Sequence, residues 1–170
     1  MIRTATADDA DALGRCHLPG WRASCAHVLP ADVLAGLRLE DFVTSWQAAL
    51  TEPDHGILLA EDAGTVIGFA RTGPTPDPRP SDDPVPGELR ALYVAPDHWG
   101  TGIAAELHAA ALAALVGAGH RTAVLWVVEG NERAIRFYRR RGWRRDGWER
   151  VKRSDGHPWT ELRLRGSLTS

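Results

Sequence analysis

Residues 94–104 read Val-Ala-Pro-Asp-His-Trp-Gly-Thr-Gly-Ile-Ala, and this stretch decides which fold is expected. It leads from a strand predicted over residues 88–94 into an apolar helix predicted over residues 103–116. The two glycines between them permit unusual backbone angles and a close approach to a ligand. Free N–H groups and the positive end of the helix dipole favour a phosphate or pyrophosphate there. An ordinary strand-to-helix turn has the same pattern, so this stretch alone leaves both interpretations open.

The residues around this turn argue against two common nucleotide-binding loops. The Lys-Ser/Thr pair of an NTPase phosphate loop is absent from the sequence of the turn. The third glycine of the dinucleotide fingerprint is also absent, and a predicted hairpin precedes the turn. The pattern therefore favours neither magnesium-dependent nucleotide hydrolysis nor an NAD-binding fold.

The pattern of apolar residues predicts an α/β fold with a mixed, mostly antiparallel sheet and helices on both faces. Pro19 and Gly20 are predicted to interrupt the first helix. Residues 73–87 hold six of the 11 prolines and predict a long loop, either a functional lid or a tolerated surface insertion. The other predicted elements are a strand over 2–5, helices over 7–17 and 40–50, a hairpin of 56–60 and 65–70, a central strand over 122–128, a helix over 131–141 and a closing pair of 143–151 and 159–164.

The composition is that of a soluble globular protein, with 44% hydrophobic and 25% charged residues. A length of 170 residues predicts a single domain over residues 1–170. A net charge of −2 argues against a nucleic-acid partner. Neither a run of roughly 18 apolar residues nor a signal peptide is evident, so we expect a cytoplasmic protein without a membrane partner. Cys16 and Cys25 fit no zinc pattern.

Two motifs resemble those of the GCN5-related N-acetyltransferase (GNAT) family. Residues 88–96 (ELRALYVAP) and 99–104 (WGTGIA) are similar to the acetyl-CoA motif, a strand that ends in a splay followed by Gln/Arg-x-x-Gly-x-Gly/Ala. Residues 131–138 (NERAIRFY), with Gly142-Trp143, are similar to Asn-x-x-Ala-x-x-Phe-Tyr…Gly-Phe. The two matches cover roughly residues 88–147, and the preceding helices and hairpin fit the family's topology.

The resemblance implies acetyl-CoA as co-substrate and no metal. It implies that backbone groups of Leu92, Tyr93 and Val94 pair with the pantetheine arm as an added strand would. Asn131 would hydrogen-bond the cofactor arm, and Tyr138 would protonate the departing thiolate, although a tyrosine there also suits simple packing. The backbone amides that would hold the pyrophosphate are those of Trp99, Gly100, Thr101, Gly102, Ile103, Ala104 and Ala105.

The sequence departs from the family pattern at two positions. Trp99 stands at the usual Gln/Arg position, so a side-chain contact there is expected to be lost. In a branch that acetylates protein N-termini, a glutamate precedes the Asn segment by five residues, and here that position is Trp126. This argues against a protein N-terminus as the acceptor.

Attack of a neutral amine on a thioester needs a base to accept a proton. Glu88 is the first candidate, because it opens the strand that leads to the cofactor turn; the alternative is a solvated residue at a strand end. Glu129 is the second candidate, and His98 and Tyr93 rank lower. The arginine-rich run over residues 133–145 is expected to be mostly a solvated face, with one or two side chains meeting the CoA 3′-phosphate or an acidic acceptor.

The function expected from the resemblance is transfer of acetyl from acetyl-CoA to a primary amine, preferably of a small molecule, by direct attack in a ternary complex. A non-catalytic acyl-CoA-binding module and a peptide or protein N-acetyltransferase are the alternatives. In this family the early helices border the acceptor pocket, so Trp21, Arg22 and Trp46 either line it or pack in the core. The sequence does not name the acceptor, and it leaves the oligomeric state open, a homodimer included.

Overall fold

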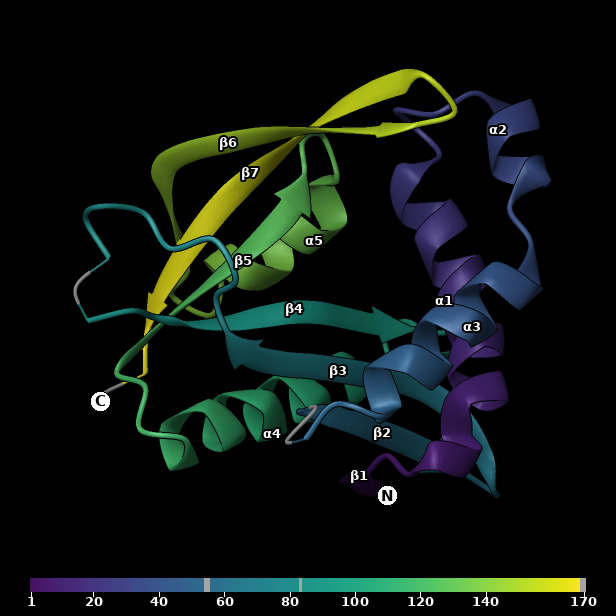
Figure 1. Ribbon diagram of the computed structural model, residues 1–170, viewed down its shortest axis with the longest axis horizontal. Helices are drawn as coiled ribbons and strands as arrows, with labels where there is room; N and C mark the ends of the chain where they lie inside the picture. Colours follow the sequence, from purple (N-terminus) through teal and green to yellow (C-terminus); the bar gives the residue numbers. More distant parts are fainter. Residues whose placement is uncertain (54–55, 83, 169–170) are drawn as a thin grey trace.

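The computed structural model describes residues 1–53, 56–82 and 84–168 (Figure 1). These residues contain one seven-stranded sheet with the order β1-β2-β3-β4-β5-β7-β6. The strands are β1 (Ile2–Thr4), β2 (Ile57–Asp62), β3 (Thr65–Pro74), β4 (Gly87–Val94), β5 (Thr122–Val128), β6 (Arg144–Ser154) and β7 (His157–Ser167). The α-helices are α1 (Ala10–Cys25), α2 (Ala31–Gly36), α3 (Leu39–Leu50), α4 (Ile103–Gly117) and α5 (Glu132–Arg139).

One parallel pair interrupts an otherwise antiparallel sheet, as the sequence predicts. The strands β4 and β5 are parallel and pair only through Gly87 with Ala123 and Glu88 with Val124. All other neighbouring strands in the sheet are antiparallel. Beyond Glu88 the two strands separate, and this opens the splay in the sheet. The edge of β4 that faces the gap is therefore left without a β5 partner over most of its length.

Helices cover both faces of the sheet, which confirms the predicted α/β layers (Figure 1). On one face, α4 and α5 share an apolar core that includes Leu107 and Tyr138. On the other face, α1 packs against α3 and both cover a second core that includes Trp46 and Phe69. No helix among residues 1–53, 56–82 and 84–168 is long and apolar enough to cross a membrane.

The predicted interruption at Pro19 and Gly20 is wrong, because α1 runs through both residues to Cys25. Burial on both sides explains the continuous helix, since Cys16 and Cys25 are both in the interior. Gly20 also lies against the ring of Tyr93, where a Cβ would come within 3.0 Å. These contacts outweigh the roughly 3 kcal/mol that an interior proline costs a helix. The short helix α2 was not predicted.

A buried histidine on α4, His108, is hydrogen-bonded to Trp143, which lies between α5 and β6. The indole N–H of Trp143 donates to Nε2 of His108 over 3.0 Å, and both side chains are in the core. Burial, with the nearby Arg141 guanidinium, lowers the pKa of His108 to about 4. The ring is therefore neutral in the folded protein at neutral pH, which leaves Nε2 free to accept the indole hydrogen bond.

We expect the free energy of unfolding to fall as the pH is lowered from 6.5 to about 4. Between pH 6.5 and about 4, His108 is protonated in the unfolded chain but not in the folded chain, so acid favours unfolding. Above pH 6.5 the ring is neutral in both states, and a further rise in pH adds no stability through His108. The loss is on the order of 3 kcal/mol, from 1.36 kcal/mol per pKa unit. Urea titrations of wild type and His108→Gln measure it. Parallel pH profiles would contradict the prediction.

Candidate functional site

A cavity of about 580 Å³ is lined by the end of β4, the glycine turn, the start of α4 and α5. Its volume is within the range of small-molecule sites. It is lined by Leu92, Val94, His98, Trp99, Gly100, Gly102, Ala104, Ala105, Arg133, Ala134, Arg136, Phe137, Tyr138, Arg140 and Arg141.

The glycine turn leaves the start of α4 open to a ligand. Gly100 and Gly102 have φ angles of +81° and +95°, which side-chain-bearing residues rarely adopt. A Cβ added at either residue would meet no protein atom within 4 Å, so the space beside both is open. The N-cap residue of α4 is Gly102, which has no side chain to cap the helix. The amides of Ile103 and Ala104 are therefore available for an anion at the positive end of the helix dipole, whereas the predicted Ala105 N–H donates to the Gly102 carbonyl over 2.8 Å.

The indole of Trp99 has its own role in shaping the turn. Its Nε1–H donates to the Val94 carbonyl oxygen over 2.8 Å, and so links the turn to the end of β4. The guanidinium carbon of Arg133 lies 3.1 Å from the centre of the indole ring. The family pattern has a Gln or Arg side chain at this position. Here the indole instead makes a hydrogen bond to Val94 and a cation–π contact with Arg133, which joins the turn to α5.

The arginine-rich run contributes more to the cavity than the sequence predicts. One or two arginines were expected to face a ligand, whereas Arg133, Arg136, Arg140 and Arg141 all line the cavity. The helical repeat causes this, because residues three or four positions apart share one face of a helix. The positive charge on this wall suits a ligand with several phosphates.

Tyr138 lies at the inner wall of the same cavity. Its side chain is buried, with 8% of the residue exposed, and burial raises the pKa of the phenol above its ordinary value. The hydroxyl is therefore protonated at neutral pH and able to donate. Within the described part of the chain, it makes no hydrogen bond to another residue, so a bound ligand would be its partner.

Four of the predicted cofactor residues do not line this cavity. The ring of Tyr93 packs on the other face of the sheet, 5.5 Å from that of Phe69. Ile103 packs against the core, and the hydroxyl of Thr101 donates to the His98 carbonyl. The fourth, Asn131, uses its Oδ1 to accept a hydrogen bond from the backbone N–H of Ala134 and so caps α5.

Glu88 is buried rather than solvated. Only 5% of the residue is exposed, and its carboxylate accepts a hydrogen bond from the Thr75 hydroxyl over 2.8 Å. It lies at the start of β4, beside the point where β4 and β5 separate, and lines neither the first cavity nor the second described below. Glu129, the second candidate base, is exposed at the end of β5.

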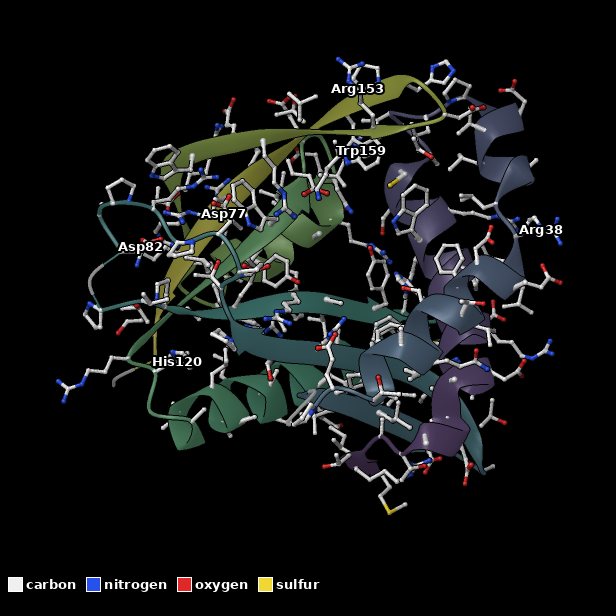
Figure 2. The ribbon with its side chains drawn as sticks, in the orientation of Figure 1. Arg38, Asp77, Asp82, His120, Arg153 and Trp159 are labelled. Atoms are coloured by element: carbon white, nitrogen blue, oxygen red, sulfur yellow. The ribbon has the colours of Figure 1, made fainter. Side chains whose placement is uncertain are left out.

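The part of the loop over residues 75–82 is held against the sheet by the ion pairs of the buried Asp82. Asp82 accepts hydrogen bonds from Arg163 over 2.9 Å and from Arg165, both on β7, and Figure 2 shows Asp82 on the loop beside that strand. Burial opposes the charged form of Asp82, but the backbone N–H of Arg79 and the Arg163 guanidinium hold the pKa of this carboxyl below its usual value. The loop is thus joined to β7 through Asp82 and to Glu88 through Thr75.

A second cavity, of about 360 Å³, lies on the opposite face of β4, between the sheet and the helices α1 and α3. Of the early residues considered from the sequence, Trp46 lines this cavity, whereas Arg22 donates to the carbonyls of Leu34 and Leu37. The ring of Trp21 packs on Trp159. The full lining is His17, Asp41, Phe42, Ser45, Trp46, Ala49, Arg71, Arg90 and Ala91.

Comparison with known sequences identifies relatives over most of the chain. The sequence model of the acetyltransferase (GNAT) family matches residues 24–143. An uncharacterized N-acetyltransferase, YuaI, of Bacillus subtilis is 29% identical over 138 residues, covering 81% of this chain and 76% of that protein. An uncharacterized N-acetyltransferase of Archaeoglobus fulgidus is 30% identical, covering 81% and 88%. A mycothiol acetyltransferase of Thermobispora bispora is 36% identical, but the match spans 63% of this chain and only 36% of that protein.

Solved structures show the same fold. The PaiA N-acetyltransferase of Thermoplasma acidophilum, solved in complex with coenzyme A, has a TM-score of 0.73 at 18% identity, with 98% of each chain covered. The acetyltransferase yncA of Salmonella typhimurium, solved with acetyl-CoA, has a TM-score of 0.69 at 20% identity, covering all of this chain and 94% of that one.

Proposed function

This chain belongs to the acetyltransferase (GNAT) family, and we propose that it transfers the acetyl group of acetyl-CoA to a primary amine of a small molecule by direct attack in a ternary complex. One observation carries the proposal: an uncapped helix start, a wall of arginines and a buried, protonated Tyr138 line a single cavity. Relatives named mycothiol acetyltransferases support a small-molecule acceptor, although this chain spans about a third of their length.

The residues of the first cavity fit acetyl-CoA. The open amides at Gly100 and Gly102 suit the pyrophosphate, and the arginines of α5 suit further phosphate charge. The unpaired edge of β4 suits a pantetheine arm that adds as a strand would. At Val94 this pairing is left to the backbone N–H, because the carbonyl accepts from Trp99.

The chemistry requires two proton movements. The amine nitrogen forms a bond to the thioester carbonyl carbon, the C–S bond breaks, and the sulfur leaves as a thiolate. Tyr138 donates its hydroxyl proton to that sulfur, and a base takes the proton that the amine loses. Holding both substrates in one complex replaces a bimolecular encounter in solution with an oriented attack.

Glu88 is the base in this proposal. It lies on β4 next to the gap between β4 and β5, on the strand whose residues contribute to both cavities. Thr75 keeps the carboxylate oriented through its hydroxyl. The carboxylate is buried and lines neither cavity, so in this proposal the amine's proton reaches it through a bridging water molecule.

The function is tested by measuring acetyl-CoA consumption with a panel of amino acids, polyamines, aminoglycosides and short peptides. We expect release of free CoA only when a small amine is present, at a rate that saturates in both substrates. Tight CoA binding without turnover would instead indicate an acyl-CoA-binding module, and turnover restricted to peptides would indicate a peptide acetyltransferase.

In the same assay, Glu88→Gln tests the base. The variant keeps the shape and the hydrogen bond to Thr75 but cannot take the proton. Because an alkylamine has a pKa near 10.4, we expect kcat/KM to fall at neutral pH and to recover partly as the pH rises and free amine becomes abundant. A variant profile that coincides with the wild-type profile would remove Glu88 from the mechanism and leave Glu129 as the next candidate.

A further inference from the structure

The walls of the second cavity carry two guanidinium groups from neighbouring strands. Arg71 on β3 is paired with Ala91 on β4, and a bulge in β4 places Arg90 beside that pair without a partner of its own in the register. A bulge redirects the side chain of the extra residue, and both arginines line the cavity. Two residues far apart in the sequence are thus brought to one wall.

The guanidinium of Arg90 lies against β3 at Gly73. A Cβ on Gly73 would lie 2.9 Å from the Arg90 Cζ, so the guanidinium rests against β3 only because residue 73 has no side chain. In that position its Nη2 donates to the Pro74 carbonyl over 2.7 Å. The guanidinium is therefore held in place before any ligand arrives, which lowers the cost of binding.

Both arginines retain unused donors. The Nη2 of Arg71 is paired with the exposed Glu52 carboxylate over 2.7 Å. The Nε of Arg71 and the Nε of Arg90 are buried without a hydrogen-bond partner among the residues that the structure describes. A buried donor without an acceptor is costly, and a carboxylate that approaches a guanidinium in its plane can satisfy two donors at once.

The charge on the cavity lining matches one carboxylate. Arg71 and Arg90 each carry a positive charge and Asp41, on the α3 wall, a negative one. Burial lowers the pKa of His17 to about 4, so this ring is neutral at neutral pH. These lining residues alone sum to one net positive charge, and Glu52, outside the lining, is already paired with Arg71, so the cavity suits a single carboxylate better than a doubly charged phosphate. The cavity volume of about 360 Å³ is near the lower limit for small-molecule sites.

The second cavity adjoins the first across a single strand. Ala91 lines the second cavity and Leu92, the next residue, lines the first, because successive residues of a strand face opposite sides of a sheet. The β4 edge beyond Glu88 is not covered by β5. A small molecule held in the second cavity would thus lie one strand away from the cavity that Tyr138 lines, and in this inference its amine reaches the thioester at the splay.

From these contacts we infer that the acceptor is a primary amine that also carries a carboxylate, as an amino acid does, and that Arg71 and Arg90 bind this carboxylate. The inference rests on the proposed acetyl transfer and names its substrate class. Arg90 is the fixed anchor, because Gly73 and the Pro74 carbonyl position it, and Arg71 closes on the carboxylate from the neighbouring strand.

The test uses a series of amino acids in which the amine lies at increasing distances from the carboxylate. Each acid is compared with the carboxamide of the same structure. For the preferred spacing we expect wild-type kcat/KM to be roughly tenfold or more higher for the acid, the usual size of a charged hydrogen-bond effect. Arg90→Gln and Arg71→Gln should each lower kcat/KM for the acid by roughly tenfold to a hundredfold, and should leave the carboxamide within about threefold.

Two further variants separate binding from folding. Gly73→Ala keeps both arginines but displaces the Arg90 guanidinium, which is the mobile end of a long side chain. The ratio of kcat/KM for the acid to kcat/KM for the carboxamide should therefore fall as it does in Arg90→Gln. Arg38→Gln is the matched control, because Arg38 lies at the start of α3 with its side chain directed away from the sheet (Figure 2). It should leave the ratio unchanged.

Calorimetry of the preferred acid with the CoA-loaded protein gives a readout that does not depend on turnover. We expect binding in the wild type that is weakened by Arg90→Gln and by Gly73→Ala. If amines are acetylated but the acid-to-carboxamide ratio is near one, or is the same in all variants, the carboxylate site is wrong while the proposed function stands. If no amine is acetylated, the proposed function fails, and absence of acid binding then excludes the site as well.

Discussion

Gly102→Val is expected to raise the dissociation constant of CoA by roughly a hundredfold, while the protein stays folded. Valine cannot adopt the φ angle of +95° without strain, so the turn must change conformation and move the first amides of α4. Loss of two charge-assisted hydrogen bonds at roughly 1.5 kcal/mol each gives this factor. Calorimetric titration of CoA into the variant measures it. The space beside Gly102 is open, so backbone conformation, and not a clash within the protein, produces the effect.

Gly64→Val provides a matched control for the strain. Gly64 has a φ of +80° and equally open surroundings, but it lies in the turn between β2 and β3, outside the lining of both cavities. Both variants should lose a similar roughly 1–2 kcal/mol of stability, and only Gly102→Val should lose CoA affinity.

A second comparison separates the backbone of the turn from its side chains. Trp99→Ala removes the tether to Val94 and the stack with Arg133 but keeps the glycine geometry, so its loss of CoA affinity should be much smaller. Equal losses for Trp99→Ala and Gly102→Val, in folded proteins, would overturn the backbone explanation.

Tyr138→Phe is expected to lower kcat by roughly tenfold to a thousandfold, with CoA affinity nearly unchanged. The change removes only the hydroxyl, and burial keeps that hydroxyl protonated at neutral pH by raising its pKa. The ring packing within the core that also contains Trp143 is retained. Steady-state kinetics with a good acceptor, together with a CoA titration, distinguish a loss in kcat from a loss in binding.

His108→Gln is the control for this prediction, because the ring of His108 neighbours that of Tyr138 without lining the cavity. It should lower stability while kcat stays within a few-fold of wild type. Normal turnover by Tyr138→Phe would remove the hydroxyl from the mechanism, and an equal loss of kcat in His108→Gln would attribute the effect to packing.

The elements around the cofactor turn could be predicted from sequence because their signals are local. A turn with positive φ angles at Gly100 and Gly102 is specified by the absence of two side chains, and the start of α4 follows directly from it. Asn131 was expected to bind the cofactor arm, whereas its side chain caps α5, although such a cap is also a local signal between residues three positions apart.

Other features could not be predicted because burial decides them. Pro19 is a helix breaker by its local chemistry, yet α1 continues through it because packing with α3 and the sheet stabilises both halves. From the sequence, Glu88 is either a base or a solvated residue at a strand end; the structure buries it, and Thr75 supplies a hydroxyl to its carboxylate.

The sequence by itself determined the α/β fold, the family and the glycine turn before α4, since the apolar periodicity, the two motifs and the paired glycines are all patterns of residue types along the chain. Only the tertiary structure decided the second cavity, because His17, Asp41, Arg71 and Arg90 come from four separate elements. The position of the Arg90 guanidinium over Gly73 depends on how β3 and β4 pair. A contact across strands has no signal in the local sequence, because its energy depends on which residues the fold brings together.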